Sequence, residues 1–301
     1  MDIIKNKTIY FLISLIVLIP GTFSLVRYGL NVSIDFTGGS RFTWRVSENV
    51  NSGTFSTIQS VFQKEGIKIA SIQKSGSNQV IIRTVPIDEK KHAILVAKSL
   101  EKIGTLQEQS FETVGPTIGS ETTMNAVKAT IFASLLIILY IAWSFRKVPK
   151  PASSWRFGVC AIVALIHDVL VLLGAFSLLG HFYHVEIDSL FVTAVLTVIG
   201  FSVHDTIVVF DRIRENLRRM PGSQFGYVVN ESILQTLARS LNTSLTVVLV
   251  LSAMLLFGGE SIRWFVVALL VGIVSGTYSS IFNAAPLLVW WEEWSRKKVS
   301  Q

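Results

Sequence analysis

Several ionisable side chains stand inside or at the edge of long apolar stretches of this sequence, among them His167, Asp168, Asp205 and Arg239. Asp205 lies within Ser189 to Phe210, a run long enough to cross a bilayer. A carboxylate there costs at least roughly 2.5 to 3.5 kcal/mol, so it needs a partner or a function. Burial disfavours the charged carboxylate and a nearby guanidinium favours it, so a small displacement of Arg239 would switch Asp205 between protonated and ionised forms. The pattern predicts a proton relay.

Helical spacing indicates which groups share a face with Asp205. Arg212 lies seven positions on and Ser202 three positions back, so both belong to the same stripe. His204 points away from that stripe by roughly 100°, which favours a packing role. Arg239 opens a later apolar stretch from the same side, so we expect these polar groups to gather in the inner half of a helix bundle.

Each candidate also has a plainer interpretation. Asp205 and Arg239 would then form a permanent ion pair that only fixes the register of two helices. His167 and Asp168 would hydrogen-bond the neighbours of their own helix. Because ionisable groups within membrane spans are usually functional, we favour the relay and include His167 and Asp168 as candidate members.

The amino-acid composition indicates a membrane protein. Of its 301 residues, 50% are hydrophobic and 16% are charged, and the mean hydropathy is +0.53. These values are typical of membrane proteins. The net charge of +7 is concentrated in short loops, as the positive-inside rule predicts, which argues against nucleic-acid binding. The single cysteine, Cys160, excludes a disulfide framework and a cysteine-based metal site.

Six apolar stretches predict six membrane-spanning helices. They are Ile9 to Val26, Ala129 to Phe145, Phe157 to Leu179, Ser189 to Phe210, Ser240 to Gly259 and Trp264 to Trp291. The first is long for a cleaved signal peptide, so we expect a retained span. Gly272 and Gly276 predict close helix packing, and Pro286 is expected to kink or end the last helix.

Basic residues gather in alternate connections, which places both chain termini on the cytoplasmic side. These residues are Arg146, Lys147, Lys150, Arg156, Arg212, Arg214, Arg218, Arg219, Arg296, Lys297 and Lys298. The segment Arg27 to Thr123 then faces outward.

That outer segment is long enough to form a soluble domain, and its patterns predict the element order β-α-β-β-α-β. The expected elements are strand Ser40 to Val46, helix Thr54 to Lys64, strands Ile67 to Gln73 and Gln79 to Val85 around a turn at 75–78, helix Asp88 to Ile103 and strand Thr105 to Val114. Asp88 is the expected N-cap and Gly104 the stop of the second helix. The order is that of a ferredoxin-like domain. The expected division is a first helix with its N-terminus (1–26), the outer domain (27–123), helices two to six (124–291) and a cytoplasmic tail (292–301).

Enzyme and cofactor motifs are absent from the sequence. Neither GxGxxG, GxxxxGK[ST] nor HExxH occurs, and no Ser-His-Asp spacing stands out. His181 and His184 lie in a short loop without convincing metal partners. We therefore expect no enzymatic activity, cofactor or metal, and an ATP-driven process would need a separate ATPase chain.

Several motifs together resemble the SecF family, the smaller half of the bacterial SecD/SecF protein-export complex. They are IDFTGG (34–39), ALIHD (164–168), GFSVHDTIVVFDRIREN (200–216), RSLNTS (239–244) and GTYSSIF (276–282). The long fourth-span motif is the specific one, and the resemblance covers essentially the whole chain. Where the family often has Asn before its aspartate, this chain has His204.

The resemblance implies a polytopic inner-membrane protein with an RND-type bundle of six helices and a periplasmic ferredoxin-like domain between the first two. It implies pairing with SecD beside the SecYEG channel, with SecA and YajC as further partners. Proton-motive force would then promote export of the translocating polypeptide, with Asp205 as the proton-carrying aspartate and Arg239 as its partner. The alternatives are an RND-type proton-coupled exporter of small molecules, which the modest outer domain disfavours, and a non-transporting scaffold of the translocase.

Overall fold

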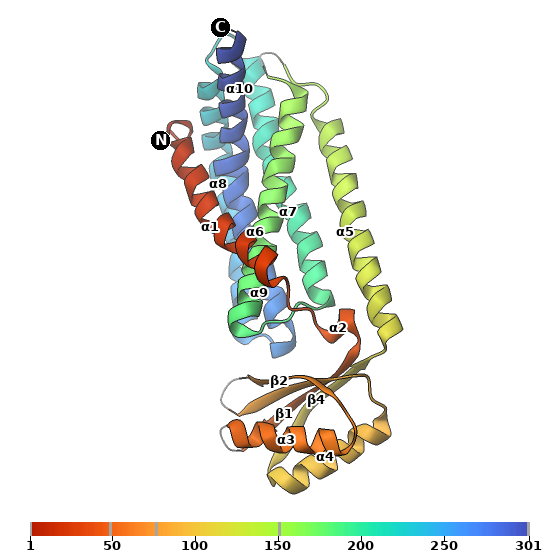
Figure 1. Cartoon of the computed structure of the whole chain (residues 1–301). Coiled ribbons are helices and arrows are strands. Elements are labelled where there is room, and N and C mark those ends of the chain that lie inside the picture. Colours follow the sequence, from red (N-terminus) through yellow and green to blue (C-terminus); the bar gives the residue numbers. More distant parts are fainter. Residues whose placement is uncertain (1, 48–49, 76–77, 150–151, 300–301) are drawn as a thin grey trace. The chain divides into compact units, whose positions relative to one another are not determined.

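The computed structural model describes residues 2–47, 50–75, 78–149 and 152–299, and the chain forms two compact units (Figure 1). The membrane unit comprises Met1–Asn31 and Lys128–Gln301, and the smaller unit comprises Val32–Val127. Lys150 and part of the turn at 75–78 lie outside the described residues.

Six helices in the described part of the chain are long and apolar enough to cross a membrane, which confirms the six predicted spans. They are α1 (Lys7–Tyr28), α5 (Pro116–Ser144), α6 (Ser154–Tyr183), α7 (Ser189–Arg219), α8 (Phe225–Phe257) and a last helix made of α9 (Arg263–Ser279) and α10 (Ala285–Val299). Helix α5 begins at Pro116, well before the predicted Ala129, because its first turns are polar and carry no hydropathy signal.

The last helix does not end at Pro286. A π-helical turn, Ser280–Ala284, joins α9 to α10, and the helix continues to Val299. Proline leaves the carbonyl four residues earlier without its usual N–H donor, here that of Phe282. A wider turn directly before the ring accommodates this change of register. The helix therefore continues beyond the apolar stretch, which ends at Trp291.

Close packing in the membrane unit depends on glycines. A Cβ at Gly174 of α6 would lie 2.7 Å from the Cα of Gly21 of α1, so the backbones of these two helices touch where they cross. A Cβ at Gly272 of α9 would clash with the side chain of Val198 of α7. The close approach that Gly272 predicted is confirmed.

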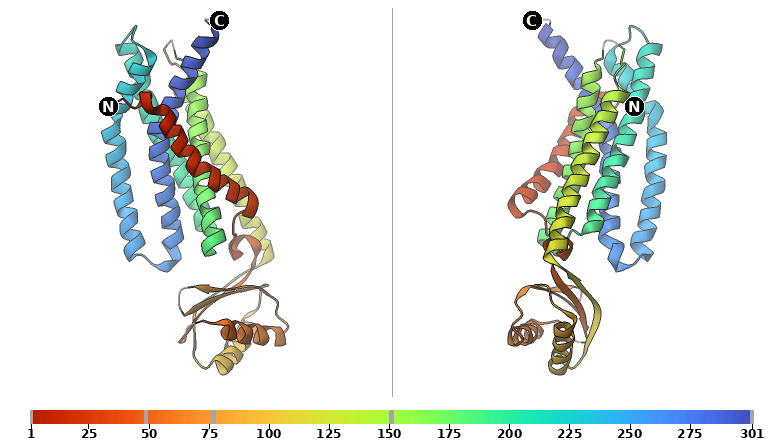
Figure 2. Two further views of the ribbon diagram at one scale, coloured as in Figure 1. Left: turned by 60° about the vertical axis from the view of Figure 1, so that its left-hand side comes forward. Right: turned by 90° about the vertical axis from the view of Figure 1, so that its right-hand side faces the viewer.

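Ion pairs show which helix ends lie together. Lys7 at the start of α1 pairs with Glu293 of α10 at 2.6 Å, and Arg156 at the start of α6 pairs with Glu292. Both chain ends lie at this end of the bundle (Figure 2). The basic connections therefore share one end of the membrane unit, as the sequence predicted.

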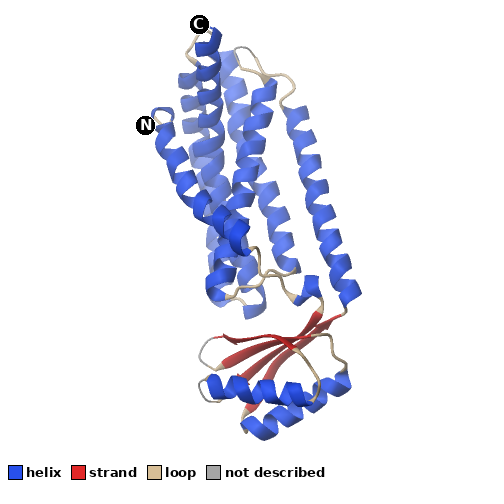
Figure 3. Cartoon of the chain, viewed as in Figure 1, coloured by secondary structure: helices blue, strands red, loops and turns tan. Residues whose placement is uncertain are grey.

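The smaller unit has the elements β1 (Gly39–Val46), α3 (Ser52–Lys64), β2 (Ile69–Ser75), β3 (Gln79–Thr84), α4 (Glu89–Ile103) and β4 (Leu106–Val114), preceded by a short helix α2 (Ile34–Thr37). Its described strands form one antiparallel sheet in the order β2-β3-β1-β4. Helices α3 and α4 cover one face of this sheet (Figure 3). Phe42, Trp44, Phe62 and Leu95 form part of the core between the sheet and the helices.

Capping explains the ends of the helices in this unit. Asp88 accepts a hydrogen bond from the Lys91 amide and Gly104 ends α4 at φ 78°, both as predicted. Strand β2 begins at Ile69 rather than Ile67. The Ile67 amide donates to the Phe62 carbonyl and so closes the end of α3.

Candidate functional site

The most complete polar cluster of the membrane unit surrounds Asp168 of α6, which is fully buried. Ser202 of α7 and Ser279 of α9 donate to its Oδ2 at 2.5 and 2.6 Å. Ser275 of α9 donates to its Oδ1 at 2.8 Å, and His167 Nδ1 lies 3.0 Å from the same oxygen. Both carboxylate oxygens are thus satisfied by donors from three helices, as a buried charge requires.

Small residues let these helices approach the carboxylate. Ser275 and Ser279 stand four positions apart, so they occupy one face of α9, and Gly276 lies beside them. A Cβ at Gly276 would lie 3.1 Å from the Cβ of Ser202 and 3.6 Å from Asp168 Oδ2. A larger residue at Gly276 would therefore separate Ser202 from Asp168.

Ser202 does not serve Asp205, although the two share a face of α7. Its hydroxyl donates to Asp168, so the face that Ser202 shares with Asp205 also meets α6. Arg212, also predicted on that stripe, pairs instead with Glu215 at 2.7 Å. Spacing along one helix identifies a face, but it does not show which neighbouring helix that face meets.

Asp205 is 3% exposed and has different surroundings from Asp168. Ser240 of α8 lies beside its carboxyl, with Arg239 and His204 as the charged or ionisable neighbours. Among the described residues, neither Asp205 Oδ2 nor Ser240 Oγ has a hydrogen-bond partner of normal geometry. The structure therefore brings Asp205 near Arg239, as the sequence predicted, but leaves this carboxyl short of donors.

Arg239 and His204 both lie on the exposed surface of the chain. Within the residues that the structure describes, no carboxylate lies in ion-pair contact with Arg239. The permanent Asp205–Arg239 pair is thus absent from this structure.

The four predicted site residues fall into two groups. His167 and Asp168 form one cluster with Ser202, Ser275 and Ser279, while Asp205 lies with Arg239 one turn further along α7. Sequence reasoning did not find Ser240, Ser275 and Ser279 as members of the site. The signal for Ser275 and Ser279 was the occurrence of hydroxyls at helical spacing next to the glycine pair Gly272 and Gly276.

The two carboxyls are suited to different chemistry. A change of protonation at Asp168 would disturb four hydrogen bonds, so this carboxylate suits a fixed structural charge. A change at Asp205 disturbs few contacts, and Arg239 lies close enough to respond to it.

A bundle of membrane-spanning helices with the buried carboxyls of Asp168 and Asp205 defines a multi-pass membrane protein of the transporter type. Residues 95–294 match the family described as protein export membrane protein SecD/SecF, C-terminal. Protein translocase subunit SecF of Thermobaculum terrenum is 46% identical over 97% of this chain and 94% of that protein. SecF of Anaerolinea thermophila is 42% identical over 98% and 96% respectively. The chain belongs to the SecF family of protein-export membrane proteins, as its motifs predicted.

Solved structures agree with this assignment. The crystal structure of SecDF, a translocon-associated membrane protein from Thermus thermophilus, superimposes with a TM-score of 0.83 at 33% identity over 97% of this chain. A SecDF structure in a super-membrane-facing form gives a TM-score of 0.70 at 32% identity. This chain spans 39% of the first SecDF chain and 40% of the second.

Proposed function

We propose that this chain uses the proton-motive force, together with SecD, to promote export of polypeptides across the bacterial inner membrane, with Asp205 as the proton carrier and Arg239 as its partner. The observation that carries the proposal is the buried Asp205 carboxyl, whose Oδ2 has no hydrogen-bond partner in the described residues. Each charge that crosses the membrane releases about 2.3 kcal/mol per 100 mV. That free energy would drive a conformational cycle without ATP.

Asp168 and His167 have a supporting part in this proposal. Asp168 holds Ser202 one turn before Asp205, so it sets the position of α7 relative to α6 and α9. His167 contributes a further hydrogen bond to the same carboxylate. A fixed cluster next to a mobile proton site gives the bundle a rigid reference against which α8 and Arg239 move.

The exposed polar side chains of α7 and α8 support a partner within the membrane. Thr193, Thr197 and His204 lie along one stripe of α7, and Gln235, Arg239, Asn242 and Thr246 lie along one stripe of α8. Such a surface is costly against lipid. We assign it to SecD, which is joined to SecF in one chain in the SecDF of Thermus thermophilus.

The proposal also covers topology and location. The smaller unit, with its β-α-β-β-α-β order, would be a periplasmic ferredoxin-like domain, and both termini would be cytoplasmic. The basic connections at one end of the bundle support this orientation. SecYEG, SecA and YajC would be further partners, and the chain would act without enzymatic chemistry of its own.

The test is secretion of a signal-bearing precursor into inner-membrane vesicles with an imposed proton gradient. Asp205→Asn should remove the stimulation by the gradient while ATP-driven translocation by SecA continues. Asp211→Asn is the matched control, because Asp211 is exposed on the same helix and should leave stimulation intact. Equal stimulation in wild type and Asp205→Asn would exclude the relay and favour a scaffold role.

A further inference from the structure

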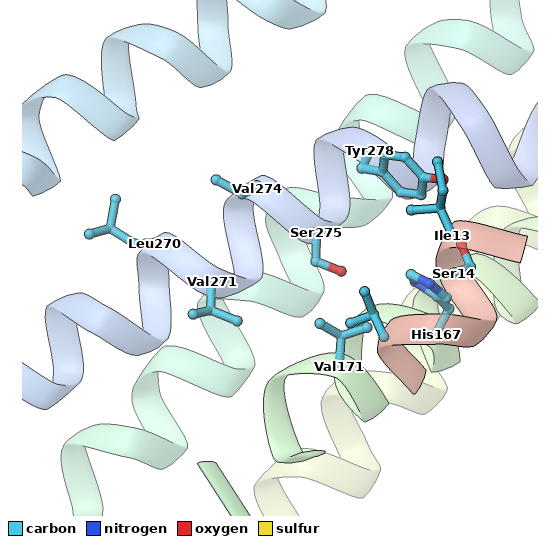
Figure 4. A pocket seen from close by; sticks show the side chains of 10 residues that line it. Ile13, Ser14, His167, Val171, Leu270, Val271, Val274, Ser275 and Tyr278 are labelled. Carbon is cyan, nitrogen blue, oxygen red and sulfur yellow. The ribbon is translucent and has the colours of Figure 1, made fainter. Parts of the chain in front are cut away.

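An apolar cavity of about 510 Å³ lies between α1, α6 and α9, apart from the Asp205 site (Figure 4). Its rim includes Ile13 and Val17 of α1 and Val274 of α9, whose side chains are between 42% and 56% exposed. These side chains lie within membrane-spanning helices, so the cavity opens toward the hydrocarbon of the bilayer. Its volume is within the range of small-molecule sites.

The course of α1 explains why the cavity exists. Helix α1 touches α6 at Gly21 and Gly174 and then diverges from it toward its own N-terminal end. On the other side of the cavity, α1 contacts α9, where the Tyr278 hydroxyl donates to the Tyr10 carbonyl at 2.8 Å. The cavity is the space between these two points of contact, and its ends are fixed by close packing and a hydrogen bond.

The cavity offers few polar atoms. The Ser14 hydroxyl donates to Asn283, and the Ser275 hydroxyl donates to Asp168, so both are already used. His167 is the exception. Its side chain is 10% exposed, it lines the cavity beside Ser14, and its Nε2 has no hydrogen-bond partner in the described part of the chain (Figure 4).

The hydrogen bond made by Nδ1 of His167 determines whether Nε2 is a donor or an acceptor. Asp168 as a carboxylate only accepts, so His167 Nδ1 carries the proton and donates it across 3.0 Å. In the neutral imidazole Nε2 is then a bare acceptor. A molecule that satisfies His167 must bring a hydrogen-bond donor into an otherwise apolar cavity.

Water is a poor occupant of such a site. A buried water needs two to four polar partners, and the described lining has one unsatisfied atom to offer. We propose that the cavity binds a bilayer-soluble molecule with an apolar body and one hydroxyl group, and that this hydroxyl donates to His167 Nε2. A lipid alcohol and a lipophilic phenol share this chemistry. Binding at this site does not depend on the proposed proton coupling.

Photolabelling of the full chain in phospholipid vesicles tests the proposal. The probes are a long-chain alcohol with a diazirine in its chain, a lipophilic phenol with the same diazirine, and the methyl ethers of both. The ethers keep the apolar body but have no donor. A neutral hydrogen bond is worth about fivefold in affinity, so we expect at least one hydroxyl probe to label the cavity helices about fivefold more than its ether. Preference for the alcohol alone would indicate a lipid source, and preference for the phenol alone an aromatic ligand.

Two variants and one control variant locate the label. His167→Phe keeps the ring volume and should abolish the preference of hydroxyl probe over ether. Val274→Trp, at an exposed rim position, should block labelling by both, whereas Ile131→Trp, exposed on α5, which does not line the cavity, should not. Equal labelling by hydroxyl probes and ethers in the wild type, or a preference that survives His167→Phe, would overturn the proposal, as would unchanged labelling of Val274→Trp.

Discussion

Ser202 donates a hydrogen bond of 2.5 Å to Asp168 and thereby joins α7 to α6 one turn before Asp205. The carboxyls of Asp168 and Asp205 thus lie at neighbouring turns of the bundle but have opposite surroundings. Asp168 has a full set of donors, and Asp205 Oδ2 has none in the described residues. This contrast separates a residue that holds the helices together from the one to which we assign proton exchange.

Asp168→Ala should destabilise the bundle strongly. The substitution removes the acceptor of Ser202, Ser275, Ser279 and His167 and leaves these groups buried without partners. Each buried donor that is left without a partner costs about 1 to 3 kcal/mol, so we expect a total loss of several kcal/mol. Denaturant unfolding of the purified chain in detergent measures the change.

The control for this prediction is Asp211→Ala. Asp211 pairs with Arg214, but its side chain is 54% exposed, and exposed pairs contribute about 0 to 1 kcal/mol. Similar losses for both variants would show that Asp168 is not a structural hub.

Two glycines of α6 should respond to alanine in opposite directions. At Gly174 the new Cβ would lie 2.7 Å from the backbone of Gly21, which cannot move aside without displacing α1. We expect Gly174→Ala to lower the free energy of unfolding by about 1 to 3 kcal/mol. At Gly158 no atom lies within 4 Å of the new Cβ among the described residues, so Gly158→Ala should stabilise the helix by about 0.5 to 1 kcal/mol. Thermal unfolding in detergent gives both values, and a stable Gly174→Ala variant would refute the close crossing.

Hydropathy and periodicity were sufficient to predict the number of spans, the order of strands and helices in the smaller unit, and the burial of Asp168 and Asp205. These features depend on patterns within single elements. The sequence did not reveal that Ser202 faces Asp168, because that contact depends on how three helices are arranged around one another. The start of α5 and the π turn before Pro286 were missed for a related reason. The first turns of α5 have no apolar signal, and the π turn depends on local packing.

Arg239→Leu should leave the fold intact and impair proton-driven export. Arg239 is exposed and makes no ion pair with a described carboxylate, so its loss leaves no buried charge behind. The proposed switching of Asp205 requires the guanidinium, so stimulation of secretion by a proton gradient should fall at least tenfold, which corresponds to about 1.4 kcal/mol of lost coupling.

Arg218→Leu is the matched control for Arg239→Leu, because Arg218 is exposed at the end of α7, away from Asp205. Blue-native gels report whether the complex with SecD still assembles. Loss of assembly in Arg239→Leu, with export reduced in proportion, would favour a role for Arg239 at the interface over one in proton transfer.

Single cysteines should distinguish the two sides of the membrane. With Cys160 replaced by alanine, Gln59→Cys on the exposed surface of α3 should react with an impermeant maleimide added to intact spheroplasts. Lys147→Cys, in the basic connection after α5, should react only after the membrane is permeabilised. The positive-inside rule places the basic connections in the cytoplasm. One span, α5, separates the connection that contains Lys147 from the smaller unit, so the two are expected on opposite sides of the membrane. Both positions are exposed, so a difference in labelling reports access rather than burial. The reverse pattern would overturn the proposed orientation and, with it, the direction in which protons would have to move through Asp205 to drive export.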